Sequence, residues 1–175
     1  AVSYKYMNVL NPFDPTYKYI HIEDIEYPKA GDHYADLICK RIGLDAPVYW
    51  HDTSDILRYG VGQYIGSYPP GFNRMILLSG HNNTWFTPLK DIKEGDIIRF
   101  NTNYCEYRYK VTDVQVLDEN DLEDFIYEHL RDDEELLVMY TCYPFEATVG
   151  RKTNRLTVFA KRIKGYDVKW RFIDE

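Results

Sequence analysis

Three residues that lie far apart in the chain carry side chains that together could perform nucleophilic catalysis. Cys142 ends the apolar run 136–142, which predicts a buried strand that delivers a thiol to its end. His81 ends an earlier strand-like run, and Arg155 opens the run that follows the cysteine. A thiol, an imidazole and a guanidinium at three strand ends would provide a nucleophile, a group that moves protons and a stabiliser of negative charge.

Each of these residues also has a purely structural interpretation, because free cysteines are mostly buried and unreactive and arginines are mostly solvated. The surroundings favour catalysis. Thr141 and Tyr143 flank Cys142 at the expected end of a strand, and residues 79–84 around His81 are small or polar. We therefore expect both the thiol and the imidazole to be accessible to a substrate.

The arginine is expected on the strand beside the cysteine. Residues 156–160 form an apolar run that could lie antiparallel to the run 136–142, and twelve residues separate Cys142 from Arg155. That spacing is enough for a loop that returns the chain. Arg151 is the competing candidate, but it falls inside the loop.

Composition limits the class of protein. The 175 residues suit one domain, and 45% hydrophobic with 16% aromatic residues exclude general disorder. A formal charge of −7 without a basic stripe argues against a nucleic-acid partner. Cys39, Cys105 and Cys142 have no metal-ligand spacing and are too few for a disulfide framework. No signal peptide or transmembrane-length run is visible, and the start at Ala1 suggests a processed or trimmed chain.

The periodicity is mostly that of strands. Residues 106–111 alternate strictly between apolar and charged side chains and predict a half-buried strand in a hairpin with 97–100. Asn120 and Glu123 have the spacing of a capping box, which predicts an amphipathic helix over 121–130. We expect a mostly β protein, a closed barrel of about eight strands with one or more short helices.

The expected domain organisation has three parts. Residues 1–35 form an N-terminal arm packed on the barrel, 36–164 form the catalytic domain, and 165–175 form a C-terminal tail. No cofactor or structural metal is expected. The acidic run 118–135 offers carboxylates that calcium prefers, although it lacks an EF-hand spacing and an acidic helix start is ordinary surface decoration.

The motifs together resemble the sortase family of cysteine transpeptidases. They are Ser79-Gly80-His81, then Met139-Tyr140-Thr141-Cys142, then Arg155 thirteen positions later. Residues 89–96 are similar to the strand and turn after the family's histidine. The segment 141–145 with Gly150 is most similar to class D, and the resemblance covers about 36–164.

Two features depart from that pattern. Asn82-Asn83 stands where other residue pairs are frequent, and the acidic insert 118–135 is longer than expected for class D and resembles the helix of class B. Residues 11–15 resemble the lid of class C enzymes, but we favour an ordinary N-terminal arm.

The resemblance implies a β-barrel enzyme that cleaves a cell-wall sorting signal of the Leu-Pro-x-Thr type after its Thr. Cys142 would form a thioester, His81 would act as acid and then base, and Arg155 would stabilise the oxyanion. Thr141 and Tyr143 would bind the substrate, with the Tyr143 amide as a second donor. The acyl group would pass to an amine of a peptidoglycan precursor or another acceptor. The expected location is the extracellular face of the cell membrane, held by an anchor outside this sequence.

Rival functions remain open from the sequence. Papain-like hydrolases place the cysteine before the histidine, the reverse of the order here, and peptidoglycan cross-linking cysteine enzymes typically carry Ser-x-Gly-Cys, which is absent. The rival from another class is a non-catalytic β-rich surface module whose tyrosine-rich faces bind glycan or protein. In that case Cys142 should be unreactive.

Overall fold

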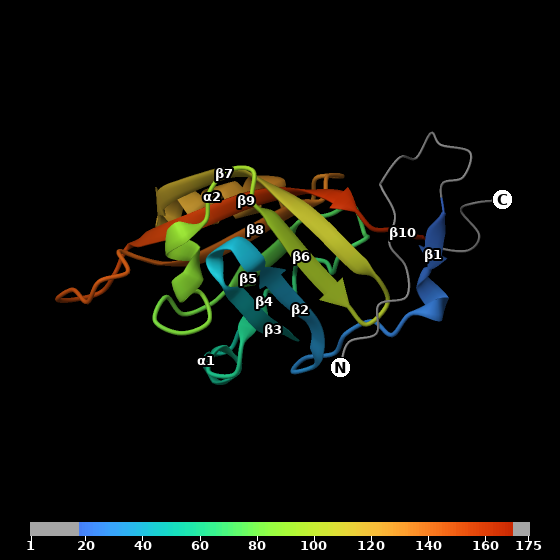
Figure 1. Ribbon diagram of the computed structural model, residues 1–175, viewed down its shortest axis with the longest axis horizontal. Helices are drawn as coiled ribbons and strands as arrows, with labels where there is room; N and C mark the ends of the chain where they lie inside the picture. Colours follow the sequence, from blue (N-terminus) through green and yellow to red (C-terminus); the bar gives the residue numbers. More distant parts are fainter. Residues whose placement is uncertain (1–17, 170–175) are drawn as a thin grey trace.

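Eight strands close into a barrel within residues 18–169, the part of the chain that this computed structural model describes. The strands are β2 (His33–Cys39), β3 (Leu44–Trp50), β4 (Val61–Gln63), β5 (Ile76–Ser79), β6 (Ile97–Thr102), β7 (Glu106–Asp118), β8 (Leu136–Tyr143) and β9 (Asn154–Lys164). Around the barrel they follow the order β2-β3-β4-β5-β8-β9-β7-β6 (Figure 1). The predicted fold class, a closed barrel of about eight strands, is confirmed.

The predicted hairpin is formed by the neighbouring strands β6 and β7. The strands pair in antiparallel register with Phe100 opposite Tyr107. Tyr107, Tyr109 and Val111 are buried, as the alternation predicts, because one face of a strand with period two turns to the core.

Two apolar clusters lie on the two faces of the wall made by β5, β8 and β9. The inner cluster fills the barrel and includes Leu78, Leu137 and Met139. The outer cluster includes Leu77 and Val138 and is covered by helix α2 (Glu119–His129). Coverage on both faces explains why the run 136–142 is apolar throughout instead of alternating.

Helix α2 begins two residues earlier than predicted. The side chain of Asp118 accepts a hydrogen bond from the Asn120 main-chain N–H at 2.8 Å and caps the helix. The expected cap at Asn120 is therefore wrong. Strand β7 runs to Asp118, so the chain turns directly from strand to helix there, and aspartate caps a helix as well as asparagine does.

The other helical elements are short. Helix α1 (Ser54–Leu57) is capped by the Thr53 side chain. The 3-10 turns are η1 (Ile22–Asp24), η2 (Lys40–Ile42) and η3 (Thr87–Asp91). No helix within residues 18–169 is both long and apolar enough to cross a membrane.

The described ends of the chain meet beside the barrel. Strand β1 (Tyr19–His21) pairs in parallel with β10 (Asp167–Lys169), at the end away from the β8–β9 connection (Figure 1). Parts of the expected arm and tail thus form a two-stranded sheet. Residues 1–17, which include the lid-like segment 11–15, and residues 170–175 lie outside the described range.

A buried charge cluster ties this end of the barrel together. The Glu135 carboxylate accepts hydrogen bonds from the main-chain N–H groups of Gly71 and Asn73, both at 3.0 Å, and from the Tyr109 hydroxyl at 2.5 Å. Arg162 lies 3.4 Å from Glu135 and also pairs with Asp167. One carboxylate and one guanidinium therefore join β7, β8, β9, β10 and the 71–73 loop.

Candidate active site

Cys142 and Arg155 are directly opposite each other on adjacent antiparallel strands, β8 and β9. Residues opposite each other in such a pair project to the same face of the sheet. That face is the outer one: Val138 and Tyr140 belong to the outer cluster, and Cys142 continues the alternation. The two side chains, with twelve residues between them in sequence, start as neighbours outside the barrel.

His81 follows β5, which runs parallel to β8 with Ser79 beside Tyr140. Hydrogen bonds hold the residues on both sides of His81 to β8. The Thr141 hydroxyl donates to the Gly80 carbonyl at 2.7 Å, and the Asn82 side-chain amide donates to the Cys142 carbonyl at 2.9 Å. Because the residues before and after His81 are both bonded to β8, the backbone of His81 is held beside Cys142. The side chain of His81 is exposed.

Gly80 is required by a close approach. A Cβ atom at this position would lie 2.8 Å from the ring of Phe86, which is fully buried. The Phe86 N–H donates to the His81 carbonyl at 3.0 Å and closes the turn that carries the imidazole. The small residue before His81 therefore allows this turn to pack against the inner core.

The three cysteines differ in exposure. Cys39 and Cys105 are buried. Burial raises the pKa of the Cys39 thiol, and it raises the pKa of the Cys105 thiol to about 11. Cys142 is partly exposed at its strand end. A nucleophile must reach its substrate as a thiolate, so Cys142 is the thiol best placed for chemistry.

The guanidinium of Arg155 is held by several groups. Its Nη1 donates to the carbonyls of Lys152 at 3.0 Å and Asn154 at 2.9 Å, and its Nη2 donates to Glu119 at 2.9 Å. Only 16% of the side chain is exposed. Arg151, the competing candidate, lies in the β8–β9 connection, is largely exposed and also pairs with Glu119.

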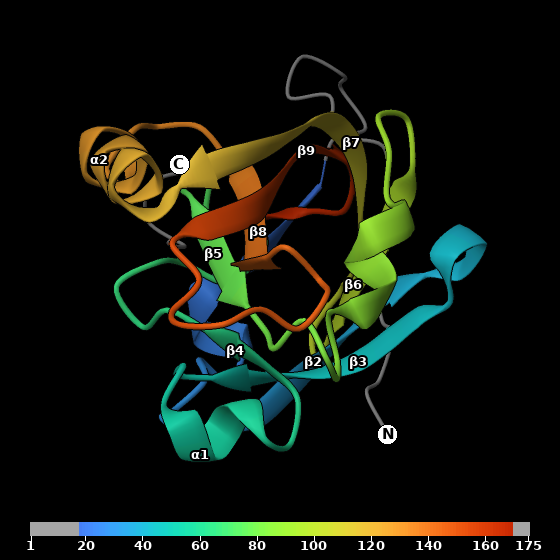
Figure 2. The same ribbon diagram turned by 90° about the vertical axis from the view of Figure 1, so that its left-hand side faces the viewer.

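A groove of about 580 Å³ lies under α2 and includes Arg155 in its lining, whereas Cys142 and His81 do not line it. Figure 2 shows α2 outside the barrel, beside the end of β7. The floor includes Leu77 and Tyr140, and the helix adds Leu122, Ile126 and Leu130. Charged side chains, Glu119, Glu123 and Arg155 among them, also line it. A groove of mixed character beside Arg155 suits a peptide with both apolar side chains and main-chain carbonyls.

The two predicted substrate-binding residues lie on the inner side of β8. Thr141 is buried and its hydroxyl is committed to Gly80, so any contact with substrate would be made by its backbone. The half-buried Tyr143 ring packs against the inner cluster and meets Phe145 edge-on. The roles of both residues stay predictions.

Several carboxylates of the acidic run have other partners. Asp118 caps α2, Asp133 pairs with Arg74, Glu134 with Lys161 and Asp132 with His129. Between residues 18 and 169, no group of three or more His, Cys, Asp or Glu side chains could hold a metal ion.

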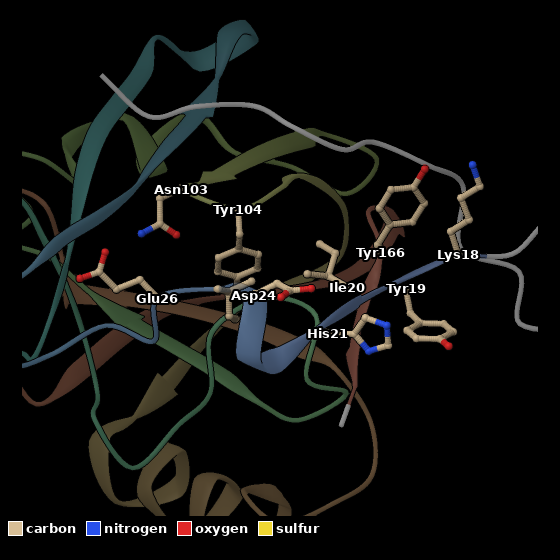
Figure 3. A pocket seen from close by; sticks show the side chains of 10 residues that line it. Lys18, Tyr19, Ile20, His21, Asp24, Glu26, Asn103, Tyr104 and Tyr166 are labelled. Atoms are coloured by element: carbon tan, nitrogen blue, oxygen red, sulfur yellow. The ribbon is translucent and has the colours of Figure 1, made fainter. Parts of the chain in front are cut away.

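A second hollow, of about 400 Å³, lies at the β1–β10 end of the molecule (Figure 3). Tyr104, Tyr166 and His21 are among its lining residues, while the thiol, imidazole and guanidinium described above are not. It is separate from the candidate active site.

Two residues of the site were missed at the level of sequence. Asn82 donates to the carbonyls of Cys142 and Pro144, and Glu119 pairs with Arg155. Asn82 was noticed only as a departure from the sortase pattern, and Glu119 only as part of an acidic run. Neither residue has a local sequence signal for its contacts, because the partners are 36 to 62 residues apart.

A closed eight-stranded barrel that carries a thiol and a guanidinium side by side on its outer face defines the class of fold and candidate site, and comparison with known proteins assigns the chain to a family. The family model described as "Sortase domain" matches residues 37–163, so the chain belongs to the sortase family. Sortases are cell-wall sorting transpeptidases that act at the cell surface. The family suggested by the sequence motifs is confirmed.

Several individual sortases are similar to this chain. Sortase D of Bacillus subtilis (strain 168) is 32% identical over 136 residues, which cover 78% of this chain and 67% of that protein. The crystal structure of sortase C from Clostridium perfringens SM101 is 28% identical, with a TM-score of 0.64 over 77% of this chain and 72% of that one. A Clostridium perfringens sortase D5 transpeptidase, 24% identical, shares the fold with a TM-score of 0.67, covering 78% and 82%.

Proposed function

We propose that this sortase cleaves a sorting signal of the Leu-Pro-x-Thr type after its Thr and transfers the acyl group to an amine acceptor. The observation that carries the proposal is the convergence on one outer face of Cys142 opposite Arg155, with His81 bracketed beside the cysteine. A Clostridium perfringens sortase C, 28% identical over 77% of this chain, has a structure with a C-terminal cell wall sorting motif. The groove under α2, whose lining includes both apolar side chains and Arg155, is the proposed place for such a substrate.

The first half of the proposed reaction forms a thioester. The Cys142 thiolate attacks the Thr carbonyl, and the carbonyl oxygen becomes an oxyanion. Arg155 and the main-chain N–H of Tyr143 donate hydrogen bonds to that oxyanion. His81, as imidazolium, gives its proton to the departing amine, and the carbon–nitrogen bond breaks.

The second half reverses these roles. An amine enters from the exposed side of His81, and the now neutral imidazole accepts the proton that the amine loses as it attacks the thioester. The carbon–sulfur bond breaks and Cys142 returns as thiolate. With a peptidoglycan precursor as the acceptor, the reaction anchors a surface protein to the cell wall at the extracellular face of the membrane.

The direct test uses a quenched Leu-Pro-x-Thr-Gly peptide and mass spectrometry of the intact protein. Wild type should gain the mass of the acyl fragment, and Cys142→Ala should not. Loss of one oxyanion donor typically lowers the rate by about 10²–10³-fold, so Arg155→Ala should fall by that order and His81→Ala at least as far. Wild-type turnover by Cys142→Ala would refute the proposal.

The choice of signal and acceptor is tested with small libraries. Acyl-enzyme formed from peptides that vary the third signal position identifies the preferred sequence, and added amines identify the acceptor by the product mass. We propose that no cofactor is needed. Calorimetric titration with millimolar calcium checks this point, and heat of binding together with faster turnover would contradict it.

A further inference from the structure

The Arg155 guanidinium has three of its five N–H donors engaged with the protein. The two Nη1 bonds go to carbonyls of its own strand and loop, and one Nη2 bond goes to Glu119. The Nε–H and the second Nη2–H have no partner among residues 18–169. Because Arg155 lies opposite Cys142 on the neighbouring strand, these two donors are the ones that a carbonyl attacked by the thiolate can use.

Glu119 is attached on several sides. It is the first residue of α2, and its main-chain N–H donates to the Thr153 carbonyl in the β8–β9 connection at 2.8 Å. Its carboxylate accepts hydrogen bonds from both terminal nitrogens of Arg151, at 2.5 and 2.7 Å, which makes a bidentate pair. The same Oε2 atom accepts the bond from Arg155. Arg151 thus fixes Glu119, and Glu119 fixes Arg155.

The charges support this chain of contacts. Hydrogen bonding by Arg151, assisted by the positive charges of Arg151 and Arg155, lowers the pKa of the Glu119 carboxyl below its ordinary value. The carboxylate is therefore charged at neutral pH, and one negative charge between two guanidinium groups leaves the cluster net positive. A net positive cluster still attracts a developing oxyanion.

We infer that Glu119 is a positioning residue for Arg155, which holds the guanidinium so that its two free donors face the substrate carbonyl that Cys142 attacks. This inference rests on the proposed function of Arg155 as oxyanion donor. The plain alternative is that Glu119 only fastens α2 to the β8–β9 connection. The two roles predict different effects of a Glu119 substitution in a protein in which Arg155 has already been replaced.

The test compares Glu119→Gln, Arg155→Lys and the double variant in peptide acylation. Glutamine keeps the length of the side chain but loses the charge. Glu119→Gln should lower kcat/KM about tenfold, the effect of losing roughly one charge-assisted hydrogen bond. In the Arg155→Lys background the same change should add little, because the group that it positions is already gone.

A second readout follows the guanidinium itself. In two-dimensional NMR of arginine Nε–Hε groups, the Arg155 signal is identified by its absence in Arg155→Lys. It should shift and broaden in Glu119→Gln. Glu128→Gln is the matched control, since Glu128 is an exposed glutamate on the same helix, away from the groove. It should change neither the signal nor kcat/KM.

The outcomes separate the two claims. Wild-type kcat/KM and an unmoved Arg155 signal in Glu119→Gln would overturn the positioning role. An equal loss in both backgrounds would also overturn it and support the fastening role. If wild type acylates no signal peptide, the proposed function falls, and the NMR comparison still decides whether Glu119 orients Arg155.

Discussion

The side-chain amide of Asn82 donates to the main-chain carbonyl of Cys142 at 2.9 Å and so joins the turn of the candidate acid–base residue to the candidate nucleophile. The same amide donates to the Pro144 carbonyl at 3.1 Å. Two bonds from one side chain fix the direction of the backbone on both sides of Tyr143. The N–H of Tyr143, the proposed second oxyanion donor, is therefore held by a residue that takes no part in the chemistry.

Replacing Asn82 by aspartate should slow acylation while the barrel stays folded. Aspartate has the same size, but it presents carboxylate oxygens to the two carbonyls instead of N–H donors. Two hydrogen bonds of about 1 kcal/mol each are lost, so we expect a fall of roughly tenfold or more in the acylation rate. Mass spectrometry of the acyl-enzyme over time measures it.

Asn83→Asp is the matched control for this prediction. Asn83 is the exposed neighbour, and no described residue hydrogen-bonds with its side chain. The substitution adds the same charge one position away and should leave acylation within about twofold of wild type, as expected for an ordinary surface substitution. Equal losses in the two variants would mean that added charge, rather than the lost bonds, is responsible.

Sequence patterns predicted those parts of the molecule whose signal is local. The strict alternation of 106–111 identified the core face of β7, and the helical spacing of 122–130 identified α2. The antiparallel return of the chain from Cys142 to Arg155 followed from two apolar runs and a short connection. The barrel wall at the site was therefore predictable.

Features that depend on distant partners were not predictable. Strand β4 has only three residues, Val61–Gln63, and is defined by its parallel pairing with β3. The cap of α2 was assigned two residues late, because Asp118 and Asn120 are both good caps and only the end of β7 decides between them. The partners of Glu119 and Asn82 come from packing of remote segments, for which a single sequence gives no signal.

Iodoacetamide should modify Cys142 and spare the other two cysteines of the folded protein at pH 8. Cys39 and Cys105 are buried and their thiol pKa values are raised, so they offer little thiolate and no access. Peptide mapping after short exposure measures the three sites separately. In about 8 M urea, which unfolds most domains of this size, all three cysteines should react. Fast labelling of Cys105 in the folded protein would contradict the buried position.

Arg162→Met should strongly destabilise the protein. The Arg162 and Glu135 side chains are only 2% and 4% exposed, and removing the guanidinium leaves a buried carboxylate without its counter-charge. Breaking such a pair typically lowers the free energy of unfolding by about 3–5 kcal/mol. Urea unfolding followed by tryptophan fluorescence measures the change.

The chain supplies a matched control one residue away. Lys161 and Glu134 form a 3.0 Å pair on the outer face, but their side chains are 59% and 58% exposed. Exposed pairs contribute about 0–1 kcal/mol, so Lys161→Met should have a small effect. A double variant, Arg162→Met with Glu135→Leu, should recover part of the loss because the Glu135 charge is removed together with its partner, while Asp167 still lacks Arg162. Similar destabilisation by Arg162→Met and Lys161→Met would contradict this assignment.

Because of the pair of Arg41 and Asp96, part of the free energy of unfolding should depend on pH in the acid range. Arg41 donates to both carboxylate oxygens of the buried Asp96, through Nε at 2.5 Å and Nη2 at 2.7 Å. This hydrogen bonding lowers the pKa of Asp96 below its ordinary value of 3.8. A carboxyl whose pKa is lowered by folding stabilises the folded state. This contribution is complete above the pKa of the carboxyl in the unfolded state, and it is lost as the pH falls through its pKa in the folded state. The loss therefore lies below about pH 4, where the folded carboxylate takes up its proton.

Asp96→Asn tests this by removing the charge at constant shape. The difference in unfolding free energy between wild type and the variant should be larger at pH 7 than at pH 3, because protonation removes the same charge from wild type at low pH. Urea unfolding at both values measures it. Asp91→Asn, a change at an exposed aspartate near the same arginine, should give a small difference at either pH. A difference between wild type and Asp96→Asn that is constant with pH would show that the Asp96 charge does not stabilise the fold.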